Sequence, residues 1–123
     1  MTANPFVILY VEDDELVRET FVEYLATPER RIVAVADVAS AREALRENNV
    51  NLLITDLTLG DDSGHELARD ALQQNPRLPV IICSGHDSTD LVRSLGATAH
   101  TLRKPIDVGE LGALLDLASA SNH

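Results

Sequence analysis

Residues 6–14 read FVILYVEDD, six apolar positions followed at once by three acids. An apolar run without polar alternation is typical of a strand buried on both faces, as in a parallel sheet with helices on each side. The same composition returns four times along the chain, at Ile32–Ala36, Leu52–Thr55, Val80–Cys83 and, more weakly, Thr98–Leu102. We therefore predict a parallel sheet of five strands.

Helical patterns occupy the segments between these runs. Apolar residues recur at three- and four-residue spacing in Leu16–Leu25, Leu67–Leu72 and Leu111–Ala118. Pairs typical of a capping box, which mark helix starts, are Ser40 with Glu43, Ser63 with Glu66 and Asp107 with Glu110. Strands that alternate with helices imply right-handed crossovers, so we predict an α/β fold, a single doubly wound (βα)5 domain over residues 1–123.

Size and composition suit one folded domain with an aliphatic core. The chain has 123 residues, of which 45% are hydrophobic and 3% aromatic, with a single cysteine. Since one cysteine cannot form an internal disulfide, we expect Cys83 to pack as a small hydrophobe in a reducing compartment. No apolar run could span a bilayer, and the first five residues lack a secretion signal, so a cytoplasmic protein without membrane contact is expected.

The charge balance is strongly acidic. Twenty Asp and Glu against ten Lys and Arg give a net charge of −10. Such a surface repels a nucleic-acid backbone unless its positive charges are clustered. Lys and Arg are spread along this chain, so we expect no direct contact with DNA or RNA.

Polar residues that could carry chemistry come shortly after the first, third, fourth and fifth apolar runs. They are Glu12–Asp14 after the first run, Asp56 after the third, Ser84 after the fourth and Lys104 after the fifth. In an open parallel sheet, ligands bind beyond the carboxyl ends of the strands. We therefore expect these acids, the hydroxyl and the lysine to meet at one edge of the sheet.

Together these groups suit phosphoryl chemistry. Carboxylates held close raise each other's pKa unless a hard divalent cation neutralises them, and Mg²⁺ binds such oxygen ligands while keeping waters that a phosphate can replace. A carboxylate can also accept a phosphoryl group as an acyl phosphate. The transfer needs chiefly in-line positioning and charge neutralisation, to which Lys104 and Ser84 could contribute.

Four motifs at these strand ends make the chain resemble the receiver domains of two-component response regulators over nearly its whole length. They are VEDDE at 11–15, ITDL at 54–57 followed by GDDSG at 60–64, CSG at 83–85 and LRKP at 102–105. The resemblance implies a CheY-like, flavodoxin-like sheet of strand order 2-1-3-4-5. It also implies a phosphoacceptor served by a histidine kinase or phosphotransfer protein, and not an enzyme that turns over a separate substrate.

For the metal site, the resemblance implies Mg²⁺ or Mn²⁺ bound directly by Asp13 and Asp56. The backbone carbonyl of Thr58 would be a further ligand, and Glu12 would act through a water. Asp14 could then cap the first helix, where an acid is favourable.

For the phosphoryl site, the resemblance implies Asp56 as the phosphorylated residue. Ser84 would be the hydroxyl that moves to a phosphoryl oxygen, and Lys104 its ion-pairing partner, with a cis Lys104–Pro105 bond. Switching would involve the fourth helix, the fifth strand and the fifth helix. A downstream protein or a second copy of the domain would bind that face.

The sequence departs from the family pattern near the fifth strand. Three positions before the lysine, where the family often has an aromatic residue, stands Thr101, with His100 before it, and the segment 96–104 is one residue longer than usual. His86, two after Ser84, occupies a position that tunes the lifetime of the acyl phosphate in the family. The usual hydroxyl-and-ring switch is therefore not expected in its standard form.

Two other functions are consistent with parts of this pattern. A phosphatase of the haloacid-dehalogenase type also forms an aspartyl phosphate, but it needs a second aspartate two residues later, where this chain has Thr58. A receiver-like module that signals without phosphorylation is the second alternative. Such a module need not keep Asp56, Ser84 and Lys104 together, which favours the phosphoacceptor.

Overall fold

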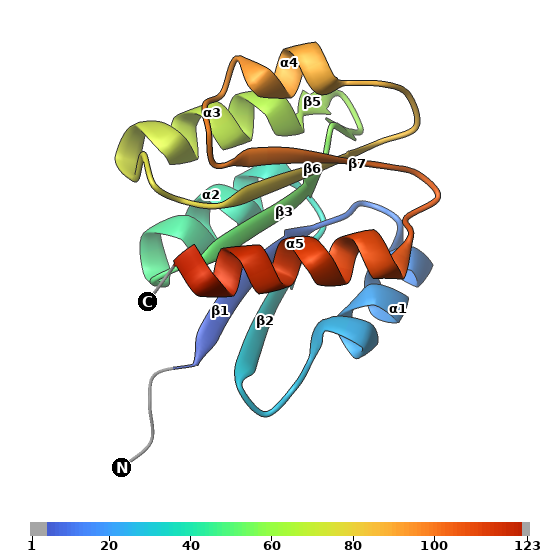
Figure 1. The fold of residues 1–123 in the computed structure, drawn as a ribbon, viewed down its shortest axis with the longest axis vertical. Helices are drawn as coiled ribbons and strands as arrows, with labels where there is room; N and C mark the ends of the chain where they lie inside the picture. Colours follow the sequence, from blue (N-terminus) through green and yellow to red (C-terminus); the bar gives the residue numbers. More distant parts are fainter. Residues whose placement is uncertain (1–4, 122–123) are drawn as a thin grey trace.

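The computed structural model describes residues 5–121, and Figure 1 shows a central sheet with helices on both faces. The sheet contains five parallel strands: β1 (Phe6–Val11), β2 (Arg30–Val35), β3 (Leu52–Asp56), β6 (Val80–Ser84) and β7 (Ala99–Arg103). Their spatial order is β2-β1-β3-β6-β7. Because β6 and β7 are the fourth and fifth strands of this sheet, the expected order 2-1-3-4-5 is confirmed, and with it the doubly wound α/β class.

Two helical layers bury the two faces of the sheet. The helices are α1 (Glu15–Leu25), α2 (Val38–Glu47), α3 (Gly64–Gln74), α4 (Thr89–Arg93) and α5 (Val108–Ser121). Ile8 and Tyr10 of β1 pack with Leu111 of α5, whereas Leu9 and Val11 pack with the buried residues of α2, α3 and α4. Successive side chains of a strand point to opposite faces, so an unbroken apolar run is what this sandwich of layers requires.

The helix starts follow side-chain caps, one of which differs from the prediction. Helix α3 is capped by Ser63, which accepts the amide of Glu66 at 3.3 Å as expected. The prediction that Ser40 caps α2 is wrong, because the helix begins at Val38. The carboxylate of Asp37 accepts the Ser40 amide at 2.7 Å, so Asp37 is the cap and Ser40 lies in the first turn as a donor.

A small hairpin between β3 and α3 was not predicted. Strands β4 (Thr58–Leu59) and β5 (Asp62–Ser63) pair antiparallel around Gly60, whose φ of 63° lies in the left-handed region that favours glycine. Two-residue strands are too short to leave a periodic sequence pattern. The predicted domain limits at residues 1 and 123 lie outside the described residues.

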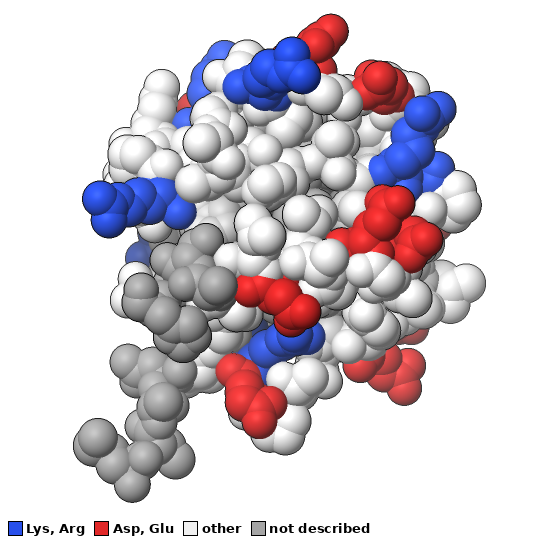
Figure 2. All heavy atoms as spheres, in the orientation of Figure 1, with Lys and Arg blue, Asp and Glu red and all other residues white. Residues whose placement is uncertain are grey.

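Surface charge agrees with the expected absence of a basic patch on the face that Figure 2 presents. There, Lys and Arg side chains lie scattered among Asp and Glu, and much of the surface over α5 is uncharged. Within residues 5–121, none of the helices has the length and apolar character needed to cross a bilayer.

Candidate functional site

The strand ends bring the expected polar residues to one edge of the sheet. Asp56 is the last residue of β3 and Ser84 the last of β6, while Glu12 and Lys104 directly follow β1 and β7. The strand register aligns the ends of β3 and β6, because Asp56 lies opposite Cys83 in the neighbouring strand. The amide of Lys104 also donates to the carbonyl of Ser84 at 2.7 Å, which ties the ends of β6 and β7 together.

Three carboxylates meet at this edge. One oxygen from each of Glu12, Asp13 and Asp56 lies within 4.8 Å of the other two. Glu12 and Asp56 are buried, at 2% and 5% exposure, while Asp13 is open to solvent. Two buried acids beside a third require compensating positive charge.

Lys104 supplies part of that charge. Its Nζ lies 2.9 Å from Oδ1 of Asp56 and 3.4 Å from Oε1 of Glu12. Burial alone would lower the pKa of Lys104, but its hydrogen bond with Asp56 and the charges of Asp56 and Glu12 raise the pKa above its ordinary value. The ammonium is therefore held protonated between the two carboxylates.

One ammonium does not balance three carboxylates, as Glu12 shows. Burial, and then the hydrogen bond and charge of Asp56, raise the pKa of Glu12 to about 7, against the opposing effects of the Asp14 amide and Lys104. A divalent cation would supply the missing charge, and hard oxygen donors are the ligands that Mg²⁺ prefers. The donor set thus fits the metal that the sequence implies.

The loop that carries Glu12 and Asp13 is fixed by its own hydrogen bonds. Oδ1 of Asp14 accepts the amide of Val17 at 3.0 Å, so Asp14 is the cap of α1. Oε2 of Glu12 accepts the Asp14 amide at 3.1 Å. Nη1 of Arg18 donates to the carbonyl of Glu12 at 2.8 Å, a contact that sequence reasoning missed because Arg18 reads as an ordinary exposed position of a helix.

A close approach of two backbones fixes Asp56. The hairpin returns the chain so that the amide of Gly64 donates to the carbonyl of Leu57 at 2.7 Å. A Cβ at Gly64 would collide with the backbone carbonyl of Asp56. Sequence reasoning placed Gly64 in a motif but missed this steric role, because the hairpin that creates it was not predicted.

Ser84 lies beside this cluster with its hydroxyl already engaged. It is buried at 4% exposure, and its Oγ accepts the amide of His86 at 3.1 Å. Nδ1 of His86 is 3.3 Å from the same oxygen. A hollow of about 120 Å³ is lined by Asp56, Leu57, Thr58, Cys83, Ser84, Gly85, His86 and Lys104. The structure therefore gathers Asp56, Thr58, Ser84 and Lys104 around one hollow.

Cys83 lines the same hollow but has the properties of a packing residue. Its side chain is buried at 2% exposure in the core that includes α5. Burial, followed by the charge of Asp56, raises the pKa of the Cys83 thiol to about 12. A thiol in that state is neither a nucleophile nor a metal ligand near neutral pH, as expected from the sequence.

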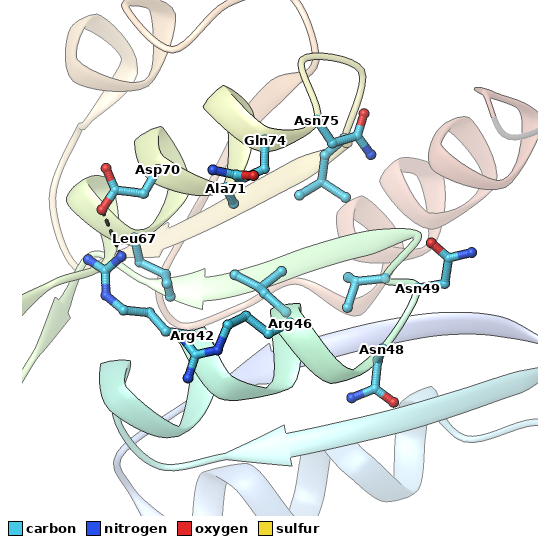
Figure 3. Close-up of a pocket in the computed structure, with 12 residues that line it drawn as sticks. Arg42, Arg46, Asn48, Asn49, Leu67, Asp70, Ala71, Gln74 and Asn75 are labelled. Carbon is cyan, nitrogen blue, oxygen red and sulfur yellow. Dashed lines mark ion pairs between the residues drawn. The ribbon is translucent and has the colours of Figure 1, made fainter.

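A larger cavity, of about 440 Å³, lies between α2 and α3 and contains none of these residues. Figure 3 shows Arg42 of α2 pointing across it toward Asp70 of α3, with Nη1 and Oδ2 2.8 Å apart. Its lining includes Asn49 and Asn75, which precede β3 and β6. The cavity is therefore at the opposite edge of the sheet from the carboxylates, and chemistry rather than size identifies the functional site.

Comparison with known proteins points to one family. The profile of the response regulator receiver domain family matches residues 8–116. Regulatory protein VirG of Agrobacterium tumefaciens (strain 15955) is 32% identical over 114 residues, which are 90% of this chain and 42% of that protein. Response regulator protein PilR of Pseudomonas aeruginosa is 32% identical over 112 residues, 89% of this chain and 25% of its own length.

Solved structures agree with the fold. A response regulator receiver protein from Pseudomonas putida superposes with a TM-score of 0.82 at 29% identity, covering 94% of this chain and 98% of that one. The chain thus corresponds to nearly the whole of that receiver structure. It spans less than half the length of VirG and a quarter of PilR.

Proposed function

This chain belongs to the response regulator receiver domain family, whose general function is phosphorylation on an aspartate, and we propose that Asp56 is the residue that accepts the phosphoryl group. One observation carries the proposal. Asp56 ends a central strand with its Oδ1 2.9 Å from Nζ of Lys104 and its carboxylate beside those of Glu12 and Asp13. A nucleophilic carboxylate next to positive charge is the arrangement that phosphoryl transfer to an acid requires.

In the proposed reaction, a carboxylate oxygen of Asp56 attacks the phosphorus of a phosphohistidine. The P–O bond forms as the P–N bond breaks, and the departing imidazole keeps the electron pair and takes a proton. Lys104 stays protonated near the reacting oxygens, where it neutralises developing charge. Ser84 exchanges its bond with the His86 amide for one to a phosphoryl oxygen.

We assign the metal ligands on the same grounds. Asp13, Asp56 and the carbonyl of Thr58 would hold Mg²⁺ or Mn²⁺, with Glu12 acting through a water. When bound, the ion supplies the positive charge that three carboxylates and one ammonium lack. The raised pKa of Glu12, which reflects burial and the neighbouring Asp56, supports this assignment.

The partners and location are also proposals. A histidine kinase or phosphotransfer protein would be the donor, and the transfer would take place in the cytoplasm. The face formed by α4, β7 and α5 would bind a downstream protein or a second copy of the domain. It exposes the apolar side chains of Leu91 and Leu117, at 41% and 56% exposure, which suits protein contact.

Incubation with acetyl phosphate tests the proposal. With Mg²⁺, intact-mass spectrometry should find the mass of one added phosphoryl group on the wild type and on Asp62→Asn, a control that removes an exposed acid nearby. Asp56→Asn and a sample with chelator should gain none. An unmodified wild type would support the module that signals without phosphorylation, and sustained release of phosphate over many turnovers would support a phosphatase.

A further inference from the structure

The residue that replaces an aromatic ring near the lysine makes a specific contact. Thr101 lies in β7 opposite Ile82 of β6, on the face of the sheet that α4 covers. Its Oγ1 is 2.9 Å from Oγ of Ser88. Ser88 is buried at 4% exposure and Thr101 is half-buried, and their contact ties the start of α4 to β7.

Ser88 contacts Thr101 and does not make the capping hydrogen bond expected at its position. It stands at the N-cap position of α4, where a serine side chain normally accepts an amide of the first turn. Here Ser88 makes no capping hydrogen bond. The amide and hydroxyl of Thr89 instead donate to Oδ1 of Asp87, at 3.0 and 2.6 Å. The Ser88 side chain is thus engaged with Thr101 and does not cap the first turn of α4.

The same short loop is held at its other end by Ser84. The Ser84 hydroxyl accepts the His86 amide at the start of residues 84–88, and the Ser88 hydroxyl contacts Thr101 at their end, so side-chain contacts hold both ends. If Ser84 turns toward a phosphoryl group on Asp56, the first contact breaks. The loop is then still held by the contact of Ser88 with Thr101 and by the hydrogen bond from Nε of Arg103 to the carbonyl of Gly85 at 3.3 Å.

We propose that Thr101 is a positioning residue, which acts through Ser88 to hold the loop from Ser84 to α4 in its resting conformation until phosphorylation of Asp56 opens the hydroxyl pair. This inference rests on the proposed function and specifies its regulation. Once released, Ser88 can accept the amide of Leu91 and cap α4. A hydroxyl pair thus takes the place that ring rotation would have had at position 101.

The energy of one hydrogen bond sets the size of the effect. A net contribution typical of a protein hydrogen bond changes an equilibrium by about fivefold. Removing the Thr101 hydroxyl while keeping the side-chain shape, as in Thr101→Val, should therefore favour the activated conformation by about that factor. Thr101→Ser keeps the hydroxyl and should behave as the wild type.

Titration with beryllofluoride and Mg²⁺, followed by NMR or calorimetry, measures this shift. Thr101→Val should bind beryllofluoride about fivefold more tightly than the wild type. Thr98→Val is the matched control, since the Thr98 hydroxyl makes no hydrogen bond within residues 5–121, and its affinity should be unchanged. Amide exchange in α4 of the free protein should be faster in Thr101→Val alone.

A double-mutant cycle separates this role from general destabilisation. In a Ser88→Ala background, Thr101→Val should have no further effect on beryllofluoride affinity, because the partner hydroxyl is already gone. Equal effects in both backgrounds, or a wild-type affinity for Thr101→Val, would overturn the inference while leaving phosphorylation of Asp56 intact. A wild type that fails to bind beryllofluoride would instead overturn the proposed function, and the inference with it.

Discussion

At the scale of single residues, charge compensation governs this site. Glu12 and Asp56 are nearly inaccessible, and Lys104 is the basic side chain that pairs with them among the described residues. Buried charges are tolerated only when paired, and an incompletely balanced set changes its protonation instead. Glu12 accordingly holds its proton to higher pH than an ordinary glutamate, with a pKa of about 7 caused by burial and by Asp56.

The raised pKa of Glu12 predicts that the metal-free protein loses stability as the pH rises. Between pH 4.5 and 7, the folded state keeps a proton on Glu12 that the unfolded chain has released, so the free energy of unfolding falls with pH in this window. We expect a loss on the order of 2 kcal/mol, smaller in Glu12→Gln. Urea unfolding in chelator across this range measures it.

Mg²⁺ should abolish most of that pH dependence, since a cation favours the carboxylate form. If Glu12→Gln shows the same loss of stability as the wild type, the buried acid responsible lies elsewhere.

The position of Asp13 in the carboxylate cluster predicts how Mg²⁺ changes the stability of the protein. An ion bound only by the folded protein raises the free energy of unfolding by RT ln(1 + [L]/Kd). This gain is about 2.7 kcal/mol when the ion concentration is a hundred times Kd. Asp13→Asn should lose most of this gain, because it removes the solvent-exposed carboxylate of the cluster. Thermal unfolding with and without Mg²⁺ measures the difference.

Asp14→Asn is the matched control for that experiment. It removes an adjacent charge while Asn still caps α1, so its response to Mg²⁺ should equal that of the wild type. An undiminished response in Asp13→Asn would refute the assignment of Asp13 as a ligand.

The sequence revealed the acids of the site but not the groups that hold them. Glu12, Asp13 and Asp56 are visible because each follows an apolar strand. Arg18 and Ser88 are not, because their roles depend on which backbone atom or hydroxyl lies within reach after folding. Contacts of that kind leave no periodic pattern.

At the scale of elements, the hairpin β4–β5 and the start of α3 determine where Asp56 lies. The chain leaves β3 at Asp56, turns through the hairpin and returns with Gly64 against the Asp56 carbonyl. Only a residue without Cβ permits this approach.

Gly64→Ala should therefore lower stability by about 1–3 kcal/mol, as overpacking in a close-packed interior does. It should also weaken the stabilisation by Mg²⁺, because either Asp56 or α3 must shift. Chemical denaturation with and without the ion measures both effects.

Gly112→Ala provides the control for that substitution. A Cβ at Gly112 would meet the Tyr24 hydroxyl oxygen at an ordinary 3.8 Å. Since alanine is favoured over glycine within a helix, stability should rise by up to about 1 kcal/mol. A Gly64→Ala protein as stable as the wild type would show that the backbone approach does not constrain Asp56.

Element boundaries were predictable where a single cap was available and less so where two competed. Strand β1 was predicted at its observed limits, and Ser63 was the cap expected for α3. For α2, both Asp37 and Ser40 are good capping residues, and the pattern of a Ser followed by a Glu favoured the wrong one. The hydrogen bond from the Ser40 amide to Asp37 decides it.

At the scale of the whole molecule, strand order creates the site. Lys104 and Glu12 are 92 residues apart in sequence, yet they are 3.4 Å apart in space. Periodicity predicts five strands and their burial, but it does not say which strands are neighbours. The order 2-1-3-4-5 came from the resemblance of the strand-end motifs to a known family, and the observed topology agrees with it.

Trapping the phosphorylated residue tests the central assignment most directly. Borohydride reduces an acyl phosphate at its carbonyl carbon, releasing phosphate and converting the aspartate into homoserine. After treatment with acetyl phosphate and Mg²⁺, peptide mapping by mass spectrometry should locate homoserine at position 56 alone. Homoserine at Asp13 or at another acid, with Asp56 unmodified, would contradict the account.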